Sequence, residues 1–348
     1  MEQRLIFPAP QKVGYMPAEL PDRPGPEQIR LRTLISAISH GTEMVSFLGT
    51  SPFVSRKVTA DRVFLPRDPA DPPFFPVTWL GYDLIGEVIA AGEKVTRYAV
   101  GDRVFTELPH QTGYVLDEKT GGMKIKPETA AEDALMLSLA TVAFVAAQDA
   151  EIKLGDCVAV FGGGTVGLLT AQMAFLNGAS RVFLVEPNED RRKLAAALCP
   201  IEGVDPSHEL PALAIRRALG RASPDVVLEC SGKVKALSAA VQAAGIGGTV
   251  VAVGFYAGDA HDFSFAEEFL HNRVTIKASM GVWGCPSRWP LTWDRRRNLD
   301  AVLALIENGR LNFRGFRTLK VPFTEAQRAY DTIRDNPAYL RVFLTYGR

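Results

Sequence analysis

The sequence predicts an α/β fold with two domains, one rich in β-strands and one built on a doubly wound parallel sheet. The chain has 348 residues, about twice the length of a typical domain, and 47% of them are hydrophobic, enough for more than one core. Short apolar runs broken by glycine and proline fill residues 29–105, whereas strand-like and helix-like runs alternate from about residue 139. The first pattern is typical of a β-rich domain and the second of a parallel sheet covered by helices.

Three runs, IRLRTLISAIS, IGEVIAAG and GDRVF, are the strands expected in the β-rich part. Residues 51–78 lie between the first two and contain six prolines. Proline has no backbone N–H and a fixed φ, so we expect a long ordered loop there, suited to form a wall of a substrate pocket.

The later strands are CVAVF, RVFLV, DVVLEC and GTVVAVG, followed by a last one near RVTIKASM. Helical runs separate them, and a further helix is expected from Trp293 to about Asn308. The C-terminal remainder, with a short helix in VPFTEAQRAYDTI, is expected to return to the first domain. We therefore predict a β-rich domain of residues 1–138 plus 285–348 and a parallel-sheet domain of residues 139–284.

Charge and cysteine content favour a small-molecule substrate. Lys plus Arg and Asp plus Glu both number 39, so no summed field attracts nucleic acid or an anionic membrane. No apolar run is long enough for a signal segment or a membrane span, which predicts a cytoplasmic protein. The four cysteines lie far apart without a C-x-x-C pair, so neither a disulfide framework nor a compact zinc site is expected.

The clearest chemical pattern is G-x-G-x-x-G between the strand CVAVF and the helix that follows it, formed by Gly162, Gly164 and Gly167. The first glycine permits a tight turn, the second lets a pyrophosphate approach the backbone, and the third lets helix and strand pack closely. Thr165 and Val166 begin the helix, whose N-terminus would face the phosphates. This pattern predicts a Rossmann dinucleotide site.

Glu186 ends the strand RVFLV, 24 residues after Gly162, near the spacing of the acid that binds the adenosine ribose. A carboxylate there repels a 2′-phosphate, so NAD is the predicted cofactor. Arg191 and Arg192 keep NADP open as an alternative. Gly254, at the end of GTVVAVG, and Arg191 complete the predicted cofactor site.

The segment GYDLIGEVIAAGEKVTRYAVGDRVF resembles the signature of the medium-chain, alcohol-dehydrogenase-like superfamily. The resemblance covers nearly the whole chain. It implies a GroES-like β-rich catalytic domain joined to a Rossmann domain, and hydride transfer between an alcohol and a nicotinamide.

The residues that bind zinc in that superfamily are replaced here. The matching positions hold His40 in HGTE, Tyr82 in GYD, and Leu137, and a catalytic zinc usually has three protein ligands. TELPHQTGYVLDEKTGG, where a structural-zinc loop is expected, has no cysteine. The comparison implies a zinc-lacking branch with no bound metal; an unusual site using His40 and Asp83 is the alternative.

Without zinc, side chains must handle the proton of the reacting hydroxyl. We expect Tyr82 or His40 to hydrogen-bond the reacting oxygen. Thr42 would relay the proton towards the ribose, a role that the resemblance implies. Glu43 and Asp83 would orient these neighbours.

The segment WGCPSRWPLTWDRRR carries the predicted substrate contacts Trp283, Trp293 and Arg296. It resembles a zinc-lacking branch that acts on cyclitols, sugars and a ring-bearing hydroxyethyl group. Aromatic faces suit such rings, and an arginine can bind an anionic group. Packing of the tryptophans and solvation of the arginines is the alternative.

The predicted activity is reversible oxidation of a secondary alcohol by NAD. Two alternatives remain at this point: a zinc-free quinone or enoyl reductase, and a dinucleotide-binding sensor without turnover. The resemblance also implies a homodimer through the last strand of the Rossmann sheet, near residues 274–280.

Overall fold

The computed structural model describes residues 2–120, 122–257, 260–281 and 293–347. It divides into two compact units: unit 1, residues 1–136 with 317–348, and unit 2, residues 137–316. The first boundary lies close to the predicted one after residue 138. The predicted boundary at 284/285 is outside the described residues, and the division falls at 316/317 instead. The reason is that α8 (Arg295–Glu307) packs against α3 (Leu137–Asp149) within unit 2.

Unit 1 is built around a sheet with the strand order β16-β17-β3-β6-β7-β9, and β8 also pairs with β3. Its strands are β3 (Gln28–Ile38), β6 (Leu84–Ala91), β7 (Arg103–Thr106), β8 (Gly113–Asp117), β9 (Met123–Lys124), β16 (Thr318–Pro322) and β17 (Arg341–Thr345). A separate hairpin pairs β1 (Glu2–Ala9) with β2 (Lys12–Ala18). Three helices accompany them: α1 (Thr42–Phe47), α2 (Ala131–Ala134) and α9 (Ala326–Asp335). The C-terminal strand β17 pairs with β3, as the predicted return of the chain requires.

One core of unit 1 joins residues from both ends of the chain. Phe7, Phe47 and Tyr330 are fully buried, with the rings of Phe47 and Tyr330 stacked at 5.2 Å between centroids. This packing fixes α1 and α9 beside the first hairpin. α1 is therefore held by a core that forms only when the C-terminal segment is in place.

The proline-rich stretch at residues 51–78 contains more regular structure than predicted. A short hairpin pairs β4 (Arg56–Val58) with β5 (Phe64–Pro66), after a 3₁₀ turn at Pro52–Val54. Most of the prolines lie outside these strands, and Pro66 occupies the end of one, where an edge position tolerates a missing N–H.

Unit 2 has a parallel sheet with the order β12-β11-β10-β13-β14-β15, the doubly wound Rossmann order. Its strands are β10 (Cys157–Phe161), β11 (Arg181–Val185), β12 (Ile201–Val204), β13 (Val226–Glu229), β14 (Thr249–Ala252) and β15 (Thr275–Ala278). The predicted combination of a GroES-like β-rich domain and a Rossmann domain is confirmed.

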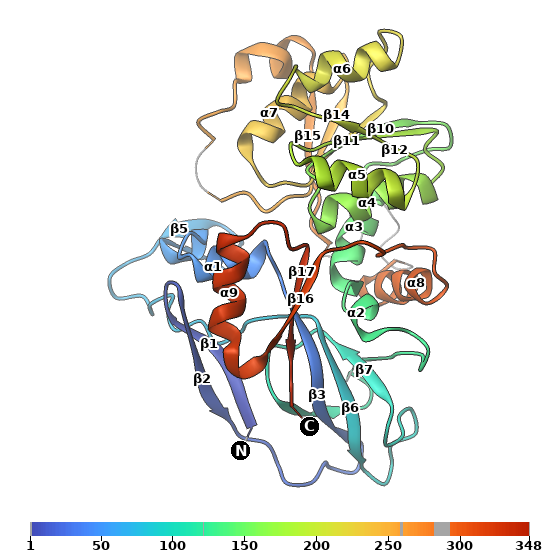
Figure 1. Ribbon diagram of the computed structural model, residues 1–348. Helices are drawn as coiled ribbons and strands as arrows, with labels where there is room; N and C mark the ends of the chain where they lie inside the picture. The colour runs from blue at the N-terminus through green and yellow to red at the C-terminus, as the bar shows by residue number, and fades with distance from the viewer. Residues whose placement is uncertain (1, 121, 258–259, 282–292, 348) are drawn as a thin grey trace. The chain divides into compact units, whose positions relative to one another are not determined.

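The helices between these strands cover both faces of the sheet (Figure 1). They are α4 (Thr165–Leu176), α5 (Glu189–Leu198), α6 (Pro211–Ala218) and α7 (Val234–Ala243). α3 packs against α4, and α6 packs against α7. Strands buried on both faces are apolar throughout, as in CVAVF and RVFLV, which explains why they were recognisable in the sequence.

No helix within the described residues is both long enough and apolar enough to cross a membrane.

Candidate functional site

The glycine-rich turn of unit 2 has the backbone geometry that its pattern predicts. Gly162 has φ of +98°, and a Cβ on it would lie 2.9 Å from the Cβ of Ser231. A Cβ on Gly167 would lie 1.8 Å from the carbonyl oxygen of Gly162. A Cβ on Gly164 would meet nothing within 4 Å. The backbone therefore packs closely at Gly162 and Gly167. The space beside Gly164, at the start of the helix that begins with Thr165 and Val166, is open, and a pyrophosphate would approach there.

Glu186 lies directly beside this turn. Its carboxylate accepts hydrogen bonds from the backbone N–H of Gly163 at 2.6 Å and of Asn188 at 3.0 Å, and the residue is 6% exposed. An ionised carboxylate has room for about four hydrogen bonds, so these two leave capacity to accept from ribose hydroxyls. The structure therefore brings the predicted ribose-binding acid to the predicted phosphate-binding turn.

The two arginines that kept NADP open both contact acidic groups. The Arg191 guanidinium lies 3.9 Å from a Glu186 carboxylate oxygen. Arg192 pairs with Asp205 at 2.8 Å and donates to the Glu186 carbonyl oxygen at 2.6 Å. Their charge is thus balanced by neighbouring acids.

Position 254 requires glycine because the backbone of another loop lies very close to it. Its N–H donates to the Glu229 carbonyl oxygen, and a Cβ on it would lie 2.1 Å from the backbone nitrogen of Gly232. The buried Glu229 carboxylate accepts from the N–H groups of Ser231 and Gly232. Gly254 therefore lets the loops after β13 and β14 meet at the carboxyl end of the sheet, the usual ligand edge of this fold.

Tyr82 is the central side chain of the candidate catalytic region in unit 1. It is half-buried, and its hydroxyl donates to the Ser39 Oγ at 2.6 Å. Burial, reinforced by the negative charge of Asp83, raises the pKa of the Tyr82 phenol to about 12. The phenol therefore stays protonated near neutral pH and acts as a hydrogen-bond donor.

Glu43 is a buried acceptor next to this pair. Its carboxylate accepts from the Ser39 backbone N–H at 2.7 Å, from His110 Nε2 at 3.0 Å and from the Tyr330 hydroxyl. Burial alone raises the pKa of Glu43, but the charge and hydrogen bond of His110, with the bonds from Tyr330 and Ser39, outweigh it and hold this pKa below its usual range. Glu43 is therefore an ionised anchor for the backbone that carries Ser39, as its predicted orienting role requires.

Asp83 has a different environment. Its carboxylate forms an ion pair with Arg341, and both side chains are fully buried. The same guanidinium donates to the carbonyl oxygens of Ile38 and Leu135, each at 3.0 Å. Asp83 thus ties the segment after Tyr82 to β17 and to the end of β3, which is a structural role rather than contact with a substrate.

The other two predicted catalytic residues lie close by in sequence. His40 is half-buried two residues after the end of β3, and Thr42 is exposed as the first residue of α1. Thr42 is thus accessible from solvent. The proton-handling roles of both residues stay predictions.

The predicted substrate residues pack within unit 2. Trp293 stacks on Phe144 with ring centroids 5.8 Å apart, and the Arg297 guanidinium lies 4.1 Å from the Trp293 ring centroid. Arg296 pairs with Asp300 one turn along α8 at 3.0 Å. Trp283 lies outside the described residues. These contacts match the packing alternative, and the substrate role stays a prediction.

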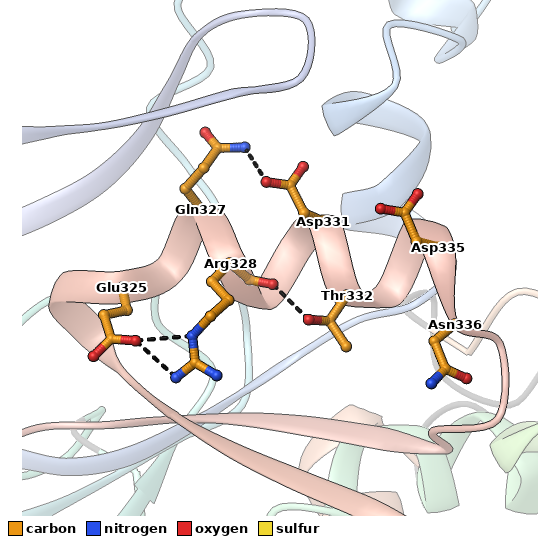
Figure 2. Close-up of a pocket in the computed structure, with 7 residues that line it drawn as sticks. All are labelled: Glu325, Gln327, Arg328, Asp331, Thr332, Asp335 and Asn336. Carbon is orange, nitrogen blue, oxygen red and sulfur yellow. Dashed lines mark hydrogen bonds and ion pairs between the residues drawn. The ribbon is translucent and has the colours of Figure 1, made fainter.

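A surface depression of about 600 Å³ lies along α9. Figure 2 shows that its lining side chains come from this helix and from the residue at each of its ends; Glu325 and Arg328 pair, and Gln327 donates to Asp331. None of the predicted site residues lines it. The charged groups of this face pair with one another, while the buried Tyr330 of the same helix contributes to the Glu43 cluster.

His110, Ser39 and Tyr330 are site residues that sequence reasoning missed. His110 lies in TELPHQTGYV, which carries no motif around the histidine, and Tyr330 lies in a helix that is predicted without a role in the site. A lone histidine in a segment that replaces a metal-binding loop was the one available signal.

Together, the Rossmann order, the glycine turn with Glu186 and the polar cluster around Tyr82 define a dinucleotide-linked oxidoreductase with a separate catalytic domain. Family models agree with both parts. Residues 59–139 match the alcohol dehydrogenase GroES-like domain, and residues 165–296 match the zinc-binding dehydrogenase domain.

Curated relatives carry the assignment further. The chain is 30% identical over 315 residues to D-guloside 3-dehydrogenase of Escherichia coli K12, covering 87% of this chain and 88% of that protein. It is 31% identical over 278 residues to (R,R)-butanediol dehydrogenase of Bacillus subtilis, covering 71% and 75%. The chain belongs to the medium-chain alcohol dehydrogenase superfamily, and it is an enzyme that oxidises or reduces alcohols.

Solved structures share the fold at lower identity. One is a zinc-binding dehydrogenase from Sinorhizobium meliloti bound to NADP, with a TM-score of 0.73, 21% identity and 99% of each chain covered. Another, from E. coli CFT073, is described as a short chain alcohol dehydrogenase with NADH, with a TM-score of 0.74, 17% identity and 99% of each chain covered. The fold thus accommodates either nicotinamide dinucleotide.

The family's name implies zinc, but the donor set of this chain does not fit a catalytic zinc. The matching positions offer the imidazole of His40, the phenol of Tyr82 with its pKa of about 12, and the alkyl side chain of Leu137. The carboxylate of Asp83, the alternative ligand, is paired with Arg341. Within the part of the chain that the structure describes, no three His, Cys, Asp or Glu residues are grouped to hold a metal ion.

Proposed function

We propose that this protein catalyses reversible, zinc-independent oxidation of a secondary alcohol with NAD. The observation that carries the proposal is the Tyr82 phenol, which stands where the family places a metal-binding histidine and which is held by Ser39 at 2.6 Å. The preference for NAD is supported by Glu186 beside the glycine turn and by the acidic partners of Arg191 and Arg192.

The chemistry follows from the protonation state of Tyr82. Bound NAD supplies the nicotinamide ring that accepts the hydride. As the hydroxyl proton leaves the substrate, negative charge grows on its oxygen. The single proton of the Tyr82 phenol is donated to Ser39 Oγ in the structure; when substrate binds, this O–H turns to the substrate oxygen and stabilises its charge, while the Ser39 hydroxyl donates to the phenol oxygen. His40 would accept the proton, and Thr42 would relay it towards the ribose, the role that the family resemblance implies. Glu43 and Asp83 act through the backbone segments that they anchor.

The proposed substrate is a ring or chain hydroxyl of a sugar or polyol. The similarity to a dehydrogenase named for a D-guloside supports a secondary ring hydroxyl, and similarity to butanediol dehydrogenase supports a secondary alcohol more generally. Trp293 and Arg296 remain candidates for contacts to such a ring or to an anionic substituent.

We also propose a homodimer formed through β15. This strand ends the sheet order within the described residues, so its outer edge offers backbone groups to a second copy. Nucleic acid and membranes are not proposed partners, because the chain carries no net charge. Sedimentation of the purified protein tests the dimer.

The first experiment measures NAD reduction with polyols, cyclitols, glycosides and hydroxyethyl aromatics, using protein freed of metal and assayed with a chelator. We expect turnover on at least one secondary alcohol under these conditions. Turnover that requires added zinc would refute the zinc-free mechanism.

Tyr82→Phe should lower kcat about 10²- to 10³-fold, since a positioned proton donor contributes that order of rate. The matched control is Tyr15→Phe, which removes a phenol bonded to the Phe323 carbonyl oxygen elsewhere in unit 1. We expect the control to keep its kcat. Unchanged turnover in Tyr82→Phe would remove Tyr82 from the mechanism.

A further inference from the structure

We infer that His110 is a positioning residue of the candidate catalytic site, holding the segment that carries Tyr82 against the segment that carries Ser39 and Glu43. The inference rests on the proposed role of Tyr82. His110 lies 28 residues after Tyr82, on the short connection between β7 and β8, and its side chain is fully buried.

The first contact of His110 is with Glu43. The Nε2 atom lies 3.0 Å from a carboxylate oxygen, and Glu43 is 3% exposed. The ionised carboxylate can only accept hydrogen bonds, so Nε2 carries the proton. This bond fixes one side of the carboxylate whose other oxygen holds the Ser39 backbone N–H at 2.7 Å.

The second contact is with the backbone just before Tyr82. The backbone N–H of His110 donates to the Leu80 carbonyl oxygen at 2.7 Å, which places the ring beside Gly81. Gly81 has φ of +90°, and a Cβ on it would lie 2.7 Å from Nε2 of the His110 ring. The ring therefore lies against the Gly81 backbone in space that only glycine leaves open.

The third contact fixes the orientation of the ring. Nδ1 lies 2.7 Å from the Ser36 Oγ, which in turn lies 2.9 Å from the Tyr346 hydroxyl. Nδ1 bonds Ser36 in either protonation state of the ring: a ring protonated on Nε2 alone accepts from the Ser36 hydroxyl, and a ring protonated on both nitrogens donates to the Ser36 Oγ. Both nitrogens are thus engaged, so the imidazole cannot turn without losing a buried hydrogen bond.

These contacts converge on the bond between Tyr82 and Ser39. The imidazole of His110 holds the Glu43 carboxylate, which in turn holds the Ser39 backbone. The same imidazole lies against Gly81, the residue before Tyr82. His110 touches neither reacting group, so its effect on turnover is indirect, through the orientation of the Tyr82 hydroxyl.

Two amide variants separate the contacts of the ring. Glutamine at position 110 can reach the place of Nε2 and keep the bond to Glu43, whereas asparagine reaches only the place of Nδ1 and keeps the bond to Ser36. We expect His110→Asn to lower kcat at least tenfold with KM changed less than threefold, and His110→Gln to retain kcat within threefold. Tyr98→Phe is the control, since it removes one buried hydroxyl bond to the Gly122 carbonyl oxygen in the same unit.

A second measurement reads the position of Tyr82 without turnover. In protein labelled with ¹³C at tyrosine Cζ, the Tyr82 signal is assigned by its loss in Tyr82→Phe. We expect this signal to shift in His110→Asn and to stay in place in His110→Gln and in Tyr98→Phe. Thermal unfolding confirms that each variant is folded.

Equal kcat in the two amide variants, together with an unshifted Tyr82 signal, would overturn the positioning role. If the wild-type protein oxidises no alcohol, the proposed function fails, and the Tyr82 signal alone decides whether His110 positions that residue.

Discussion

The candidate catalytic region of unit 1 and the cofactor turn of unit 2 are each centred on a buried carboxylate, but they are assembled in opposite ways. Glu186 accepts from backbone N–H groups 23 and 2 residues away, at Gly163 and Asn188. Glu43 accepts from Ser39, four residues away, but also from His110 and Tyr330, which lie 67 and 287 residues away.

The difference shows how each site depends on the fold. The cofactor turn requires three neighbouring parallel strands, β11, β10 and β13, and the loops at their ends. The catalytic region requires β3, the loop before β8, the helix α9 and the strand β17 to be in place together. A change in the long-range contacts of unit 1 should therefore cost stability as well as activity, whereas a change at Glu186 should act mainly on cofactor affinity.

The largest effect is expected from Asp83→Asn. The variant leaves the fully buried Arg341 guanidinium without its ionic partner, and breaking one side of a buried pair costs about 3–5 kcal/mol. Urea unfolding measures the change. Glu87→Gln, which breaks the exposed pair between Arg32 and Glu87, should cost about 0–1 kcal/mol. Similar losses in the two variants would show that β17 is not secured by this ion pair.

A smaller effect is expected from Glu43→Gln, about 1–3 kcal/mol of the free energy of unfolding, because an amide oxygen serves fewer of the buried donors. The pH dependence of this stability difference shows whether Glu43 acts as an ionised carboxylate. Since the folded-state pKa of Glu43 is lowered, its stabilisation is complete above the ordinary value of about 4.3 and is lost as the pH falls through the lower folded-state pKa.

Urea unfolding at several pH values tests this. The difference between wild type and Glu43→Gln should be constant from neutral pH to about pH 5 and should shrink at lower pH. The exposed Glu93→Gln provides the baseline. A difference that is the same at pH 7 and pH 3.5 would show that Glu43 is not an ionised anchor.

Features that depend on neighbouring residues in the chain could be predicted from the sequence. The apolar strands of unit 2, the glycine turn and Glu186 follow one another along the chain, and α8 begins at Arg295, two residues after the predicted start at Trp293. In unit 1, the apolar runs broken by glycine and proline indicated the β-rich class, whereas the return of the chain was predicted without the strand β17 that carries it out. The GroES-like and Rossmann domains and the enzyme class were confirmed.

Long-range contacts could not be predicted in the same way. Nothing near His110 or Tyr330 in the sequence marks them as partners of Glu43, because tertiary packing alone brings them together. The same reason explains Asp83, whose partner Arg341 is 258 residues away. It also explains the domain boundary, since the packing of α8 against α3 assigns residues up to 316 to unit 2.

The smallest of the three effects is expected from Glu186→Ala. Loss of the ribose-binding carboxylate should weaken NAD binding about tenfold, or ~1.4 kcal/mol, while NADP binding is less affected because the repulsion of a 2′-phosphate is removed as well. Calorimetric titration with each dinucleotide measures the ratio of dissociation constants. Glu189→Ala is the control: this residue lies three positions further on, in the first turn of α5, and pairs with the exposed Lys193, so its loss should leave that ratio unchanged. Because the hydrogen bonds of the Glu186 carboxylate lie within the cofactor turn of unit 2, at Gly163 and Asn188, the variant should keep the kcat of the wild type at saturating NAD. A loss of kcat would mean that the two sites are not separable and that Glu186 acts beyond cofactor affinity.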